Sequence, residues 1–586
     1  MSLCDKVPDR GRDSTRGVQG MPSREIDSLL HTAVPGWNGR NGLPQVVTYS
    51  FEMDGTGAFE KPWAPFNAAQ QDATRSALAQ WSAVSGLSFV EVPDTPGGRG
   101  IAVRFGLHEL PFDHVGRAYL PLHGGDVALD LSRYGGGTGA EFTETLLHEI
   151  GHAIGLKHPF TGSVTLPYLW DNTDYTVMSY TPGPSGIATK LGATKLGPLD
   201  VLAARHIYGT PADKAAWPIR YSYDARLRAV RMDVRPGDVE VQGTDYRDAV
   251  FATAGNNVIR AGAGDDLIHA GAGSNAASGG AGRDTLALGA TRRQASLDVQ
   301  AESIGVGGLP GRQGSVSAAG ETTRFYEMER ISFIDGHFSY TAEDPDAQVA
   351  RLYRAGLGRL PDAGGLAFWG ERVTEGASLV SVAQSFMSGP EFQARFGGLD
   401  DAGFVAQTYR NVLGREADSG GFTNWYSRLL SGSLSRAEVL VSLSESAENK
   451  QLTASLVANG LWVQDPDAAA VARLYDTTLN RLPDGGGLAS WSAHLGAGAS
   501  LHDVAARFIA SPEFLARYGG LDSAGFVQAM YQNVLDRPGD PAGVEYWTGV
   551  LDGGRTDRAG VVVAFSESQE HRVALAPVIE GGILLA

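Results

Sequence analysis

Apolar residues follow different spacings in successive parts of the chain. In QQDATRSALAQWSAVS (70–85) they recur every three or four positions, which predicts an amphipathic helix. SFVEV (88–92) and GIAVRF (100–105) have the short apolar runs that are typical of strands. Residues 25–215 therefore predict an α/β (α+β) domain.

Residues 216–343 combine short β-like segments with glycine-rich turns. Four nine-residue units follow one another without a gap at 252–287, with the sequences ATAGNNVIR, AGAGDDLIH, AGAGSNAAS and GGAGRDTLA. This period predicts a short parallel β-roll in which two units form one coil. Residues 18 apart should then stack, which pairs Asn257 with Asn275 along one edge and Asp266 with Asp284 along the other.

The last third of the chain predicts all-α repeat modules. The spacing Tyr-x5-Arg-x2-Asp-x2-Gly-x3-Trp begins four times, at Tyr353, Tyr409, Tyr475 and Tyr531. The region therefore divides into two modules, 344–455 and 465–578, each with two related halves. Aromatic residues at fixed spacing are typical of a core, and the Asp is suited to an N-cap.

The two ends of the chain differ from these regions. Residues 1–24 are polar and predict a flexible tail or pro-segment. Residues 579–586 carry one acidic residue followed by apolar ones, which is compatible with a C-terminal secretion signal or with a tail that docks on the last module. Neither a secretory leader nor an apolar run long enough to span a bilayer is apparent, so we expect no transmembrane segment.

Composition narrows the range of partners. The 586 residues carry 48 basic and 66 acidic side chains, a formal net charge of −18 that argues against nucleic acid as a partner. Cys4 is the single cysteine, so an intramolecular disulfide and a cysteine-based zinc site are both excluded.

The strongest chemical signal is HEIGHAIGLKHP, which begins at His148. On the predicted helix, His148 and His152 lie one turn apart and can hold one Zn²⁺, while Glu149 can take a proton from a water on the metal. Gly155 can end the helix and return His158 as the third ligand, which leaves an open, catalytic position. The alternative is a helix whose histidines only pack or face solvent.

The motif H-E-x-x-H-x-x-G-x-x-H-P resembles that of the metzincin metallopeptidases, and TVMSY (176–180) resembles their Met-turn. Pro159, GRAYLPLHGGDVALDL (116–131) and LGPLDVLAARHIYG (196–209) resemble the serralysin branch. The resemblance implies that Met178 forms a floor beneath the histidines. It also implies that Tyr180 can be a fifth zinc ligand and can swing away to stabilise an oxyanion.

The nonapeptides resemble the RTX calcium-binding repeats. In that pattern the aspartates supply oxygen ligands to Ca²⁺, which assigns this role to Asp266 and Asp284. Asn257 and Asn275 offer only neutral oxygens, so calcium should prefer the aspartate column. A metal-free glycine-rich turn region is the alternative.

The helical modules resemble the DUF4214 family of bacterial extracellular proteins. That resemblance implies little about activity. The modules are either structural or contact a cell-surface polymer or surface layer. An acidic, cysteine-poor chain with such repeats also resembles the substrates of type I secretion, so we expect it to be secreted by that route. Retention at the cell surface would require the modules to bind there.

These features together predict a secreted zinc endopeptidase acting on extracellular or cell-surface protein substrates. Glu149 would act as the general base and Zn²⁺ and Ca²⁺ as the cofactors. Two alternatives stay open. One is a surface-attached adhesion or scaffold protein with a vestigial peptidase domain, and the other is a narrow-specificity processing protease for a surface-layer protein.

Overall fold

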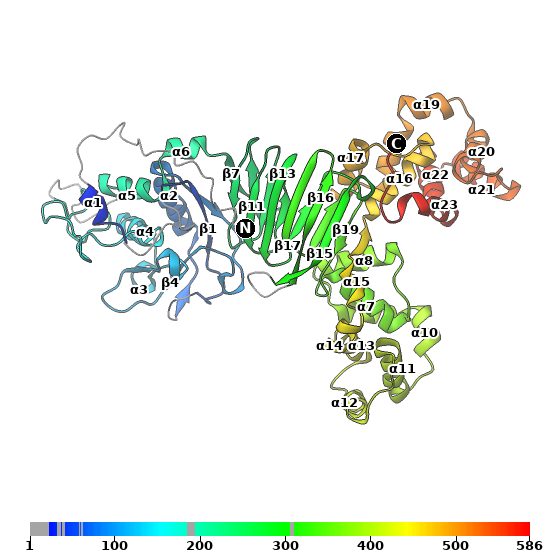
Figure 1. The fold of residues 1–586 in the computed structure, drawn as a ribbon, viewed down its shortest axis with the longest axis horizontal. Coiled ribbons are helices and arrows are strands. Elements are labelled where there is room, and N and C mark those ends of the chain that lie inside the picture. The colour runs from blue at the N-terminus through cyan, green and yellow to red at the C-terminus, as the bar shows by residue number, and fades with distance from the viewer. Residues whose placement is uncertain are drawn as a thin grey trace. The chain divides into compact units, whose positions relative to one another are not determined.

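The structure is a computed structural model of the chain, and it describes residues 23–31, 37, 42–57, 59, 62–183, 194–304 and 310–586. The predictions for residues 1–22, including Cys4, lie outside these ranges. The chain forms two compact units, Met1–Met232 with Thr244–Arg247, and Asp233–Gly243 with Asp248–Ala586. Each unit is described by itself, and Figure 1 labels the elements of both.

The first unit is built on a mixed sheet with the strand order β3-β1-β4-β6-β5. Strands β3, β1, β4 and β6 are parallel, β5 is an antiparallel edge strand, and β2 pairs with β4. The elements in this part of the chain are α1 (Ser23–Asp27), β1 (Gln45–Phe51), β2 (Trp63–Ala64), α2 (Ala68–Val84), β3 (Leu87–Glu91), η1 (Pro96–Gly98), β4 (Val103–His108), β5 (Gly116–Ala118), η2 (Pro121–His123), β6 (Val127–Asp130), α3 (Leu131–Tyr134), α4 (Ala140–Ala153), α5 (Pro198–Tyr208), α6 (Pro211–Ala216), β7 (Ile219–Asp224) and β8 (Ala229–Val234).

The helix and the two strands expected from residues 70–105 are confirmed as α2, β3 and β4. Asn67 and Gln70 form a capping box at the start of α2, which satisfies backbone donors that the helix itself leaves unpaired. Trp81 on α2 and Phe142 on α4 are buried in one core with Phe105 of the sheet. This apolar layer fixes α4, the helix that carries the zinc motif.

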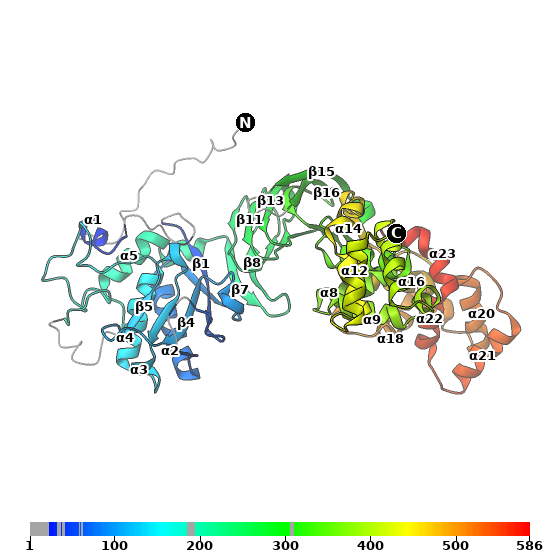
Figure 2. The same ribbon diagram turned by 90° about the horizontal axis from the view of Figure 1, so that it is seen from below.

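The second unit begins with the parallel roll, drawn in green in Figure 2, where β11 and β13 lie side by side. One sheet has the order β9-β11-β13-β17-β16-β15, and a second contains β10-β12-β14-β18-β19-β20. The strands are β9 (Glu240–Gln242), β10 (Asp248–Ala252), β11 (Val258–Ala263), β12 (Leu267–His269), β13 (Gly273–Ala281), β14 (Thr285–Ala287), β15 (Ser296–Ile304), β16 (Pro310–Ala318), β17 (Glu321–Met328), β18 (Arg330–Phe333) and β19 (Gly336–Ser339), with the short helix η3 at Arg292–Gln294. Val258 pairs with Ala276 and Leu267 with Thr285, so the 18-residue coil is confirmed.

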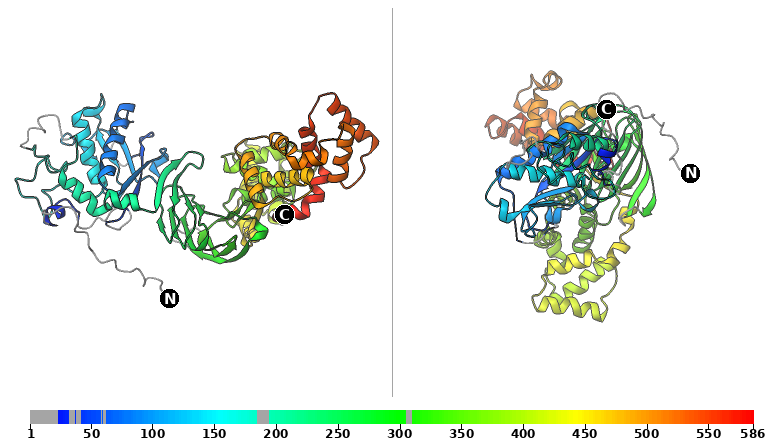
Figure 3. Two further views of the ribbon diagram at one scale, coloured as in Figure 1. Left: turned by 90° about the horizontal axis from the view of Figure 1, so that it is seen from above. Right: turned by 90° about the vertical axis from the view of Figure 1, so that its left-hand side faces the viewer.

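Helices make up most of the rest of this unit, from yellow-green to red in Figure 3. The first group comprises α7 (Pro345–Leu357), α8 (Ala363–Thr374), α9 (Leu379–Ser388), α10 (Pro390–Phe396), α11 (Asp401–Leu413), α12 (Ser419–Leu430), α13 (Arg436–Ser444), α14 (Ala447–Leu452) and α15 (Ser455–Ala458). The second comprises α16 (Pro466–Leu479), α17 (Gly485–Gly496), α18 (Leu501–Ile509), α19 (Pro512–Tyr518), α20 (Ser523–Val534), α21 (Pro541–Asp552), α22 (Arg558–Ser566) and α23 (Gln569–Ile579).

The repeated motif of these helices has the predicted structural role. Its aspartates are N-caps that each accept a backbone N–H from the motif glycine, at Asp362, Asp418, Asp484 and Asp540. Its tyrosines are buried, and each motif arginine lies over the tyrosine ring of its own half.

A strand that the sequence analysis did not predict separates the two helical groups. Strand β20 (Leu461–Gln464) pairs antiparallel with β19 and extends a sheet of the roll. Gly336 of β19 has φ +150°, and a Cβ there would lie 2.4 Å from the carbonyl oxygen of Val463. Only glycine permits this close approach.

The C-terminal segment 579–586 packs on the last helical group. Ile583 is fully buried in its core, and its N–H donates to Asp335 Oδ2 at 2.6 Å. The docked tail is thus observed, and an export role for the segment stays a prediction.

Candidate metal centre

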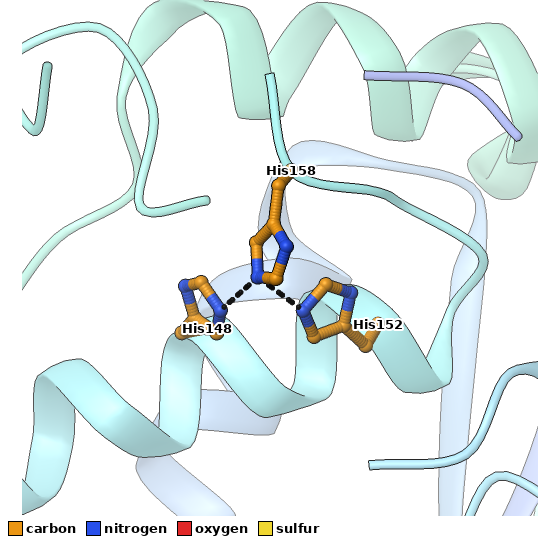
Figure 4. A group of neighbouring side chains, drawn as sticks. All are labelled: His148, His152 and His158. Carbon is orange, nitrogen blue, oxygen red and sulfur yellow. Dashed lines mark hydrogen bonds between the residues drawn. The ribbon is translucent and has the colours of Figure 1, made fainter. Parts of the chain in front are cut away.

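Helix α4 places His148 and His152 one turn apart on the same side (Figure 4). Its apolar side faces the core through Phe142, Leu146, Ile150 and Ala153. Gly155 has φ +98°, a left-handed conformation that ends the helix as predicted. The chain then turns back and brings His158 opposite the first two histidines.

The ring nitrogens of the three histidines converge on one point. His158 Nε2 lies 3.1 Å from His148 Nε2 and 3.0 Å from His152 Nε2. The other ring nitrogens donate to backbone carbonyls, His148 Nδ1 to Val177 at 2.7 Å and His152 Nδ1 to Leu156 at 2.8 Å. These bonds fix the tautomers that direct the Nε2 lone pairs inward. Nitrogens at about 2.0–2.1 Å from a tetrahedral zinc would lie about 3.3 Å apart, so the site fits this ion.

Burial sets the charge of the site. It lowers the histidine pKa values, to about 3 for His148 and about 4 for His152 and His158, and the neighbouring imidazoles lower them further. All three are therefore neutral, as metal ligands must be. Burial raises the pKa of Glu149 to about 8, since this carboxyl is almost inaccessible to water.

Asp200 supports the site from behind, and the sequence analysis did not single it out. Its carboxylate accepts the Thr176 hydroxyl at 2.6 Å and the Val177 N–H at 2.9 Å, together with the N–H of Gly197 at 2.8 Å. Val177 in turn accepts the Nδ1–H of His148. Asp200 thus holds the turn that orients a histidine. The sequence feature that could have pointed to Asp200 is its place in LGPLD (196–200), at the start of α5.

The structure places Met178 and Tyr180, the two residues of the expected Met-turn, next to the zinc motif. Met178 is fully buried, and a Cβ at Gly151 would lie 2.4 Å from its sulfur, so the thioether packs directly against the zinc helix. Tyr180 is 67% exposed, and its hydroxyl lies 2.8 Å from His158 Nε2. Phe160 stacks on the His158 ring with centroids 5.0 Å apart and also contacts Tyr180.

Lys157 ties the loop that carries His158 to the N-terminal part of the chain. Its ammonium group donates to the backbone carbonyls of Ser28, Thr161 and Val164 at 2.5, 2.6 and 3.1 Å. Its own N–H donates to Leu29 at 2.9 Å. Nothing in the sequence of the motif indicated that Lys157 would bind these carbonyls.

The predicted calcium residues lie in the roll. Asp266 and Asp284 are buried, and the N–H of Asp266 donates to Asp284 Oδ1 at 2.9 Å, which confirms that they stack. Glu329 continues the column, because its Oε2 accepts the N–H of Asp284 at 2.8 Å. Glu329 lies outside the nonapeptides and was not among the predicted calcium residues.

Three family profiles match the chain in the order of its regions. Matrixin matches residues 47–179, and the RTX calcium-binding nonapeptide repeat matches 242–277 and 268–290. The domain of unknown function DUF4214 matches 383–453, 464–517 and 505–574. The chain therefore carries a region similar to Matrixin, followed by RTX repeats and DUF4214 domains, and it has serralysins among its relatives. These profiles imply zinc and calcium as cofactors, as predicted.

Individual relatives agree with that class. Serralysin A of Dickeya chrysanthemi is 27% identical over 36% of this chain and 48% of its own length. Serralysin of Proteus mirabilis is 30% identical over 30% of this chain and 42% of its own length. The hatching enzyme of Paracentrotus lividus is 35% identical over 27% and 29%. The chain thus spans less than half the length of these relatives.

Among solved structures, myroilysin is 16% identical and aligns over 23% of this chain and 58% of its own, with a TM-score of 0.16. Within the described ranges, no helix is both long and apolar enough to cross a membrane.

Proposed function

We propose that the chain is a secreted zinc-dependent endopeptidase that hydrolyses peptide bonds of extracellular or cell-surface proteins. One observation carries this proposal: the Nε2 atoms of three histidines converge, and Glu149, the residue that follows His148 on α4, is buried. A helix whose histidines only packed would not need three inward-facing lone pairs at one point.

Glu149 is the proposed general base and acid. Zinc held by His148, His152 and His158 would supply Lewis-acid chemistry, polarising the substrate carbonyl and lowering the pKa of a nearby water. Glu149 takes a proton from the attacking water as the new C–O bond forms. It delivers that proton to the amine nitrogen as the C–N bond breaks.

Strand β5 is the proposed binding place for an extended substrate. It is the edge strand of its sheet, so its outer backbone groups can pair with an added strand. A Cβ at Gly116 of β5 would lie 2.6 Å from Glu149 Oε1. The edge therefore passes directly by the proposed base, and glycine keeps this place clear.

Tyr180 is the proposed oxyanion donor. Its hydroxyl lies at the metal centre while most of its ring is exposed, so the side chain has room to move. A phenol O–H can donate to the carbonyl oxygen as negative charge develops there. Direct ligation of zinc by Tyr180 in the resting state is part of the same proposal.

Secretion is proposed from the calcium repeats and the serralysin likeness. Low cytosolic calcium would leave the roll without its ions until the chain is exported, which couples folding to arrival outside. Type I export through residues 579–586 and surface contact through the helical modules are further parts of this proposal. A deletion of residues 345–575 that localises and cleaves as the full chain does would contradict the role of the modules.

The decisive experiment measures casein hydrolysis and metal content for the full chain and two variants. Wild type should bind about one zinc and lose activity with a chelator. Glu149→Gln should keep zinc and lose turnover, whereas Glu144→Gln, on the same helix, should keep both. Zinc binding by wild type without cleavage of casein or surface proteins would favour the scaffold alternative.

A further inference from the structure

The two edges of the roll use the same backbone arrangement with different side chains. The amide edge consists of Asn257 and Asn275, and the acidic edge consists of Asp248, Asp266, Asp284 and Glu329. In both, a side-chain oxygen accepts the N–H of the preceding residue in its column, at 2.9 Å from Asn257 to Asn275 and at 2.8–2.9 Å along the acidic edge. One atom of each side chain is therefore already used.

The second atom separates the edges. On the amide edge that atom is an –NH₂ group, which donates to carbonyl oxygens of the turns. Asn257 Nδ2 lies 3.1 Å from the oxygen of Ala270, and Asn275 Nδ2 lies 2.7 Å from that of Gly271. On the amide edge, the side-chain NH₂ groups of the two asparagines therefore donate the hydrogen bonds that these turn carbonyls accept.

On the acidic edge the second atom is an oxygen with nothing to donate. The Oδ2 atoms of Asp266 and Asp284 are buried, and no hydrogen-bond donor in the described part of the chain reaches either. The two residues are only 2% and 0% exposed. A Cβ at Gly279 would lie 2.3 Å from Asp284 Oδ2 and 2.4 Å from the oxygen of Glu327, so oxygen atoms crowd this place.

Buried, unpartnered carboxylate oxygens among carbonyls need a cation, and oxygen-only ligands suit Ca²⁺. We propose that the roll binds calcium along the acidic edge only, with Glu329 as the last side-chain ligand. The amide nitrogens of Asn257 and Asn275 take the place of the ion along the other edge. Ala270 and Gly271 begin one nonapeptide, and Gly279 and Gly280 begin the next. Equivalent turns therefore contact an asparagine amide on one edge and an aspartate carboxylate on the other.

Glu329 is included because it ends the column and does not belong to a repeat. Asp284 has no nonapeptide after it, so the next coil offers no aspartate. The chain instead returns through β17, and Glu329 then bonds the N–H of Asp284 and is 4% exposed. Its longer side chain reaches the column from a different backbone position.

The test is calcium titration by calorimetry and thermal unfolding, with and without calcium, on the full chain. The double variant Asp266→Asn/Asp284→Asn should lose calcium ions relative to wild type, lose most of the calcium-induced rise in Tm, and melt higher than wild type in the absence of calcium. Asn257→Asp/Asn275→Asp should bind at least one additional calcium and melt lower without it. Glu329→Gln should weaken calcium binding about tenfold or more.

Matched controls lie one position earlier on each edge. Asp265→Asn and Asn256→Asp change the same charge at side chains that face solvent, and they should leave calcium stoichiometry unchanged. An aspartate-to-asparagine double variant that keeps the wild-type calcium response would overturn the acidic edge as the site. An asparagine-to-aspartate variant with unchanged stoichiometry would overturn the substitution on the amide edge.

Discussion

The histidine centre and the acidic edge are both buried clusters of metal-ligating groups, yet they differ in what holds them together. The histidines are neutral, because burial keeps their pKa values near 3–4, and His148 and His152 are anchored by backbone carbonyls. On the acidic edge, burial and neighbouring carboxylates raise the pKa of Asp266 to about 10, and burial raises that of Asp284 to about 7.

Because the two clusters are held together differently, a bound ion would have a different role in each. The histidine centre is preorganised by hydrogen bonds, so an ion bound there would add reactivity to an existing arrangement. On the acidic edge, no donor in the described part of the chain reaches the second oxygens of Asp266 and Asp284, so an ion bound there would be part of the fold. Neutralising Glu149 should therefore abolish turnover and leave zinc bound, whereas neutralising Asp266 and Asp284 should remove calcium.

The largest effect is expected for Glu149→Gln. Loss of the general base should lower kcat/KM by roughly 10²–10⁴-fold. Zinc content and the calcium response should stay as in wild type, because Glu149 is not a ligand in either region. Peptide hydrolysis assays with metal analysis check this. Loss of zinc in this variant would show that the centre depends on the carboxylate for its assembly.

Calcium removal should act on stability rather than on the chemistry. Taking calcium from 100-fold above its Kd to zero should lower the free energy of unfolding of the roll by about 2.7 kcal/mol per site. Calorimetry should show the roll transition moving while the peptidase transition stays in place. Equal shifts of both transitions would remove the contrast between the regions.

Asp200→Asn sharpens the claim that the histidine centre is organised by its surroundings. The amide cannot accept all of the bonds that the carboxylate accepts from Thr176, Val177 and Gly197. Zinc affinity should fall about 10–100-fold, the usual cost of losing such support. Asp213→Asn is a matched control, since Asp213 accepts the Thr210 hydroxyl in an exposed cap. Unchanged zinc affinity would place the organising bonds elsewhere.

The smallest effect is expected for a charged pair that is neither buried nor near a metal. Arg537 and Glu570 pair at 2.7 Å with side chains 40% and 49% exposed. Replacing Glu570 by Gln should cost no more than about 1 kcal/mol of stability, because water screens the pair. Urea unfolding measures this cost. A larger loss would mean that burial is not what separates strong from weak charge effects in this chain.

Local signals carried most of the sequence predictions. The spacing of His148 and His152 and the glycine at 155 predicted the metal centre because helix geometry and a left-handed turn are properties of adjacent residues. The nine-residue period predicted the stacking of Asp266 on Asp284 in the same way. Each of these predictions depends only on residues that are close together in the sequence.

Contacts between distant segments could not be predicted. Asp200 reaches Thr176 through the way α5 packs, and Glu329 enters the acidic column from the bend between β17 and β18, which has no repeat signature. Strand β20 is four residues, LWVQ, between helical segments, which is too short for a period to show. Tertiary packing decides all three.

Strand β20 also protects the roll from association with other molecules. It covers the outer side of β19, where Phe338 packs against Trp462 with centroids 5.1 Å apart. Without it, β19 would present unpaired backbone groups and an aromatic residue, which invites pairing with another chain. Roll fragments that end before residue 461 should therefore aggregate. The short segment between the two helical groups thus covers the edge of a sheet whose other strands lie more than 120 residues earlier in the sequence.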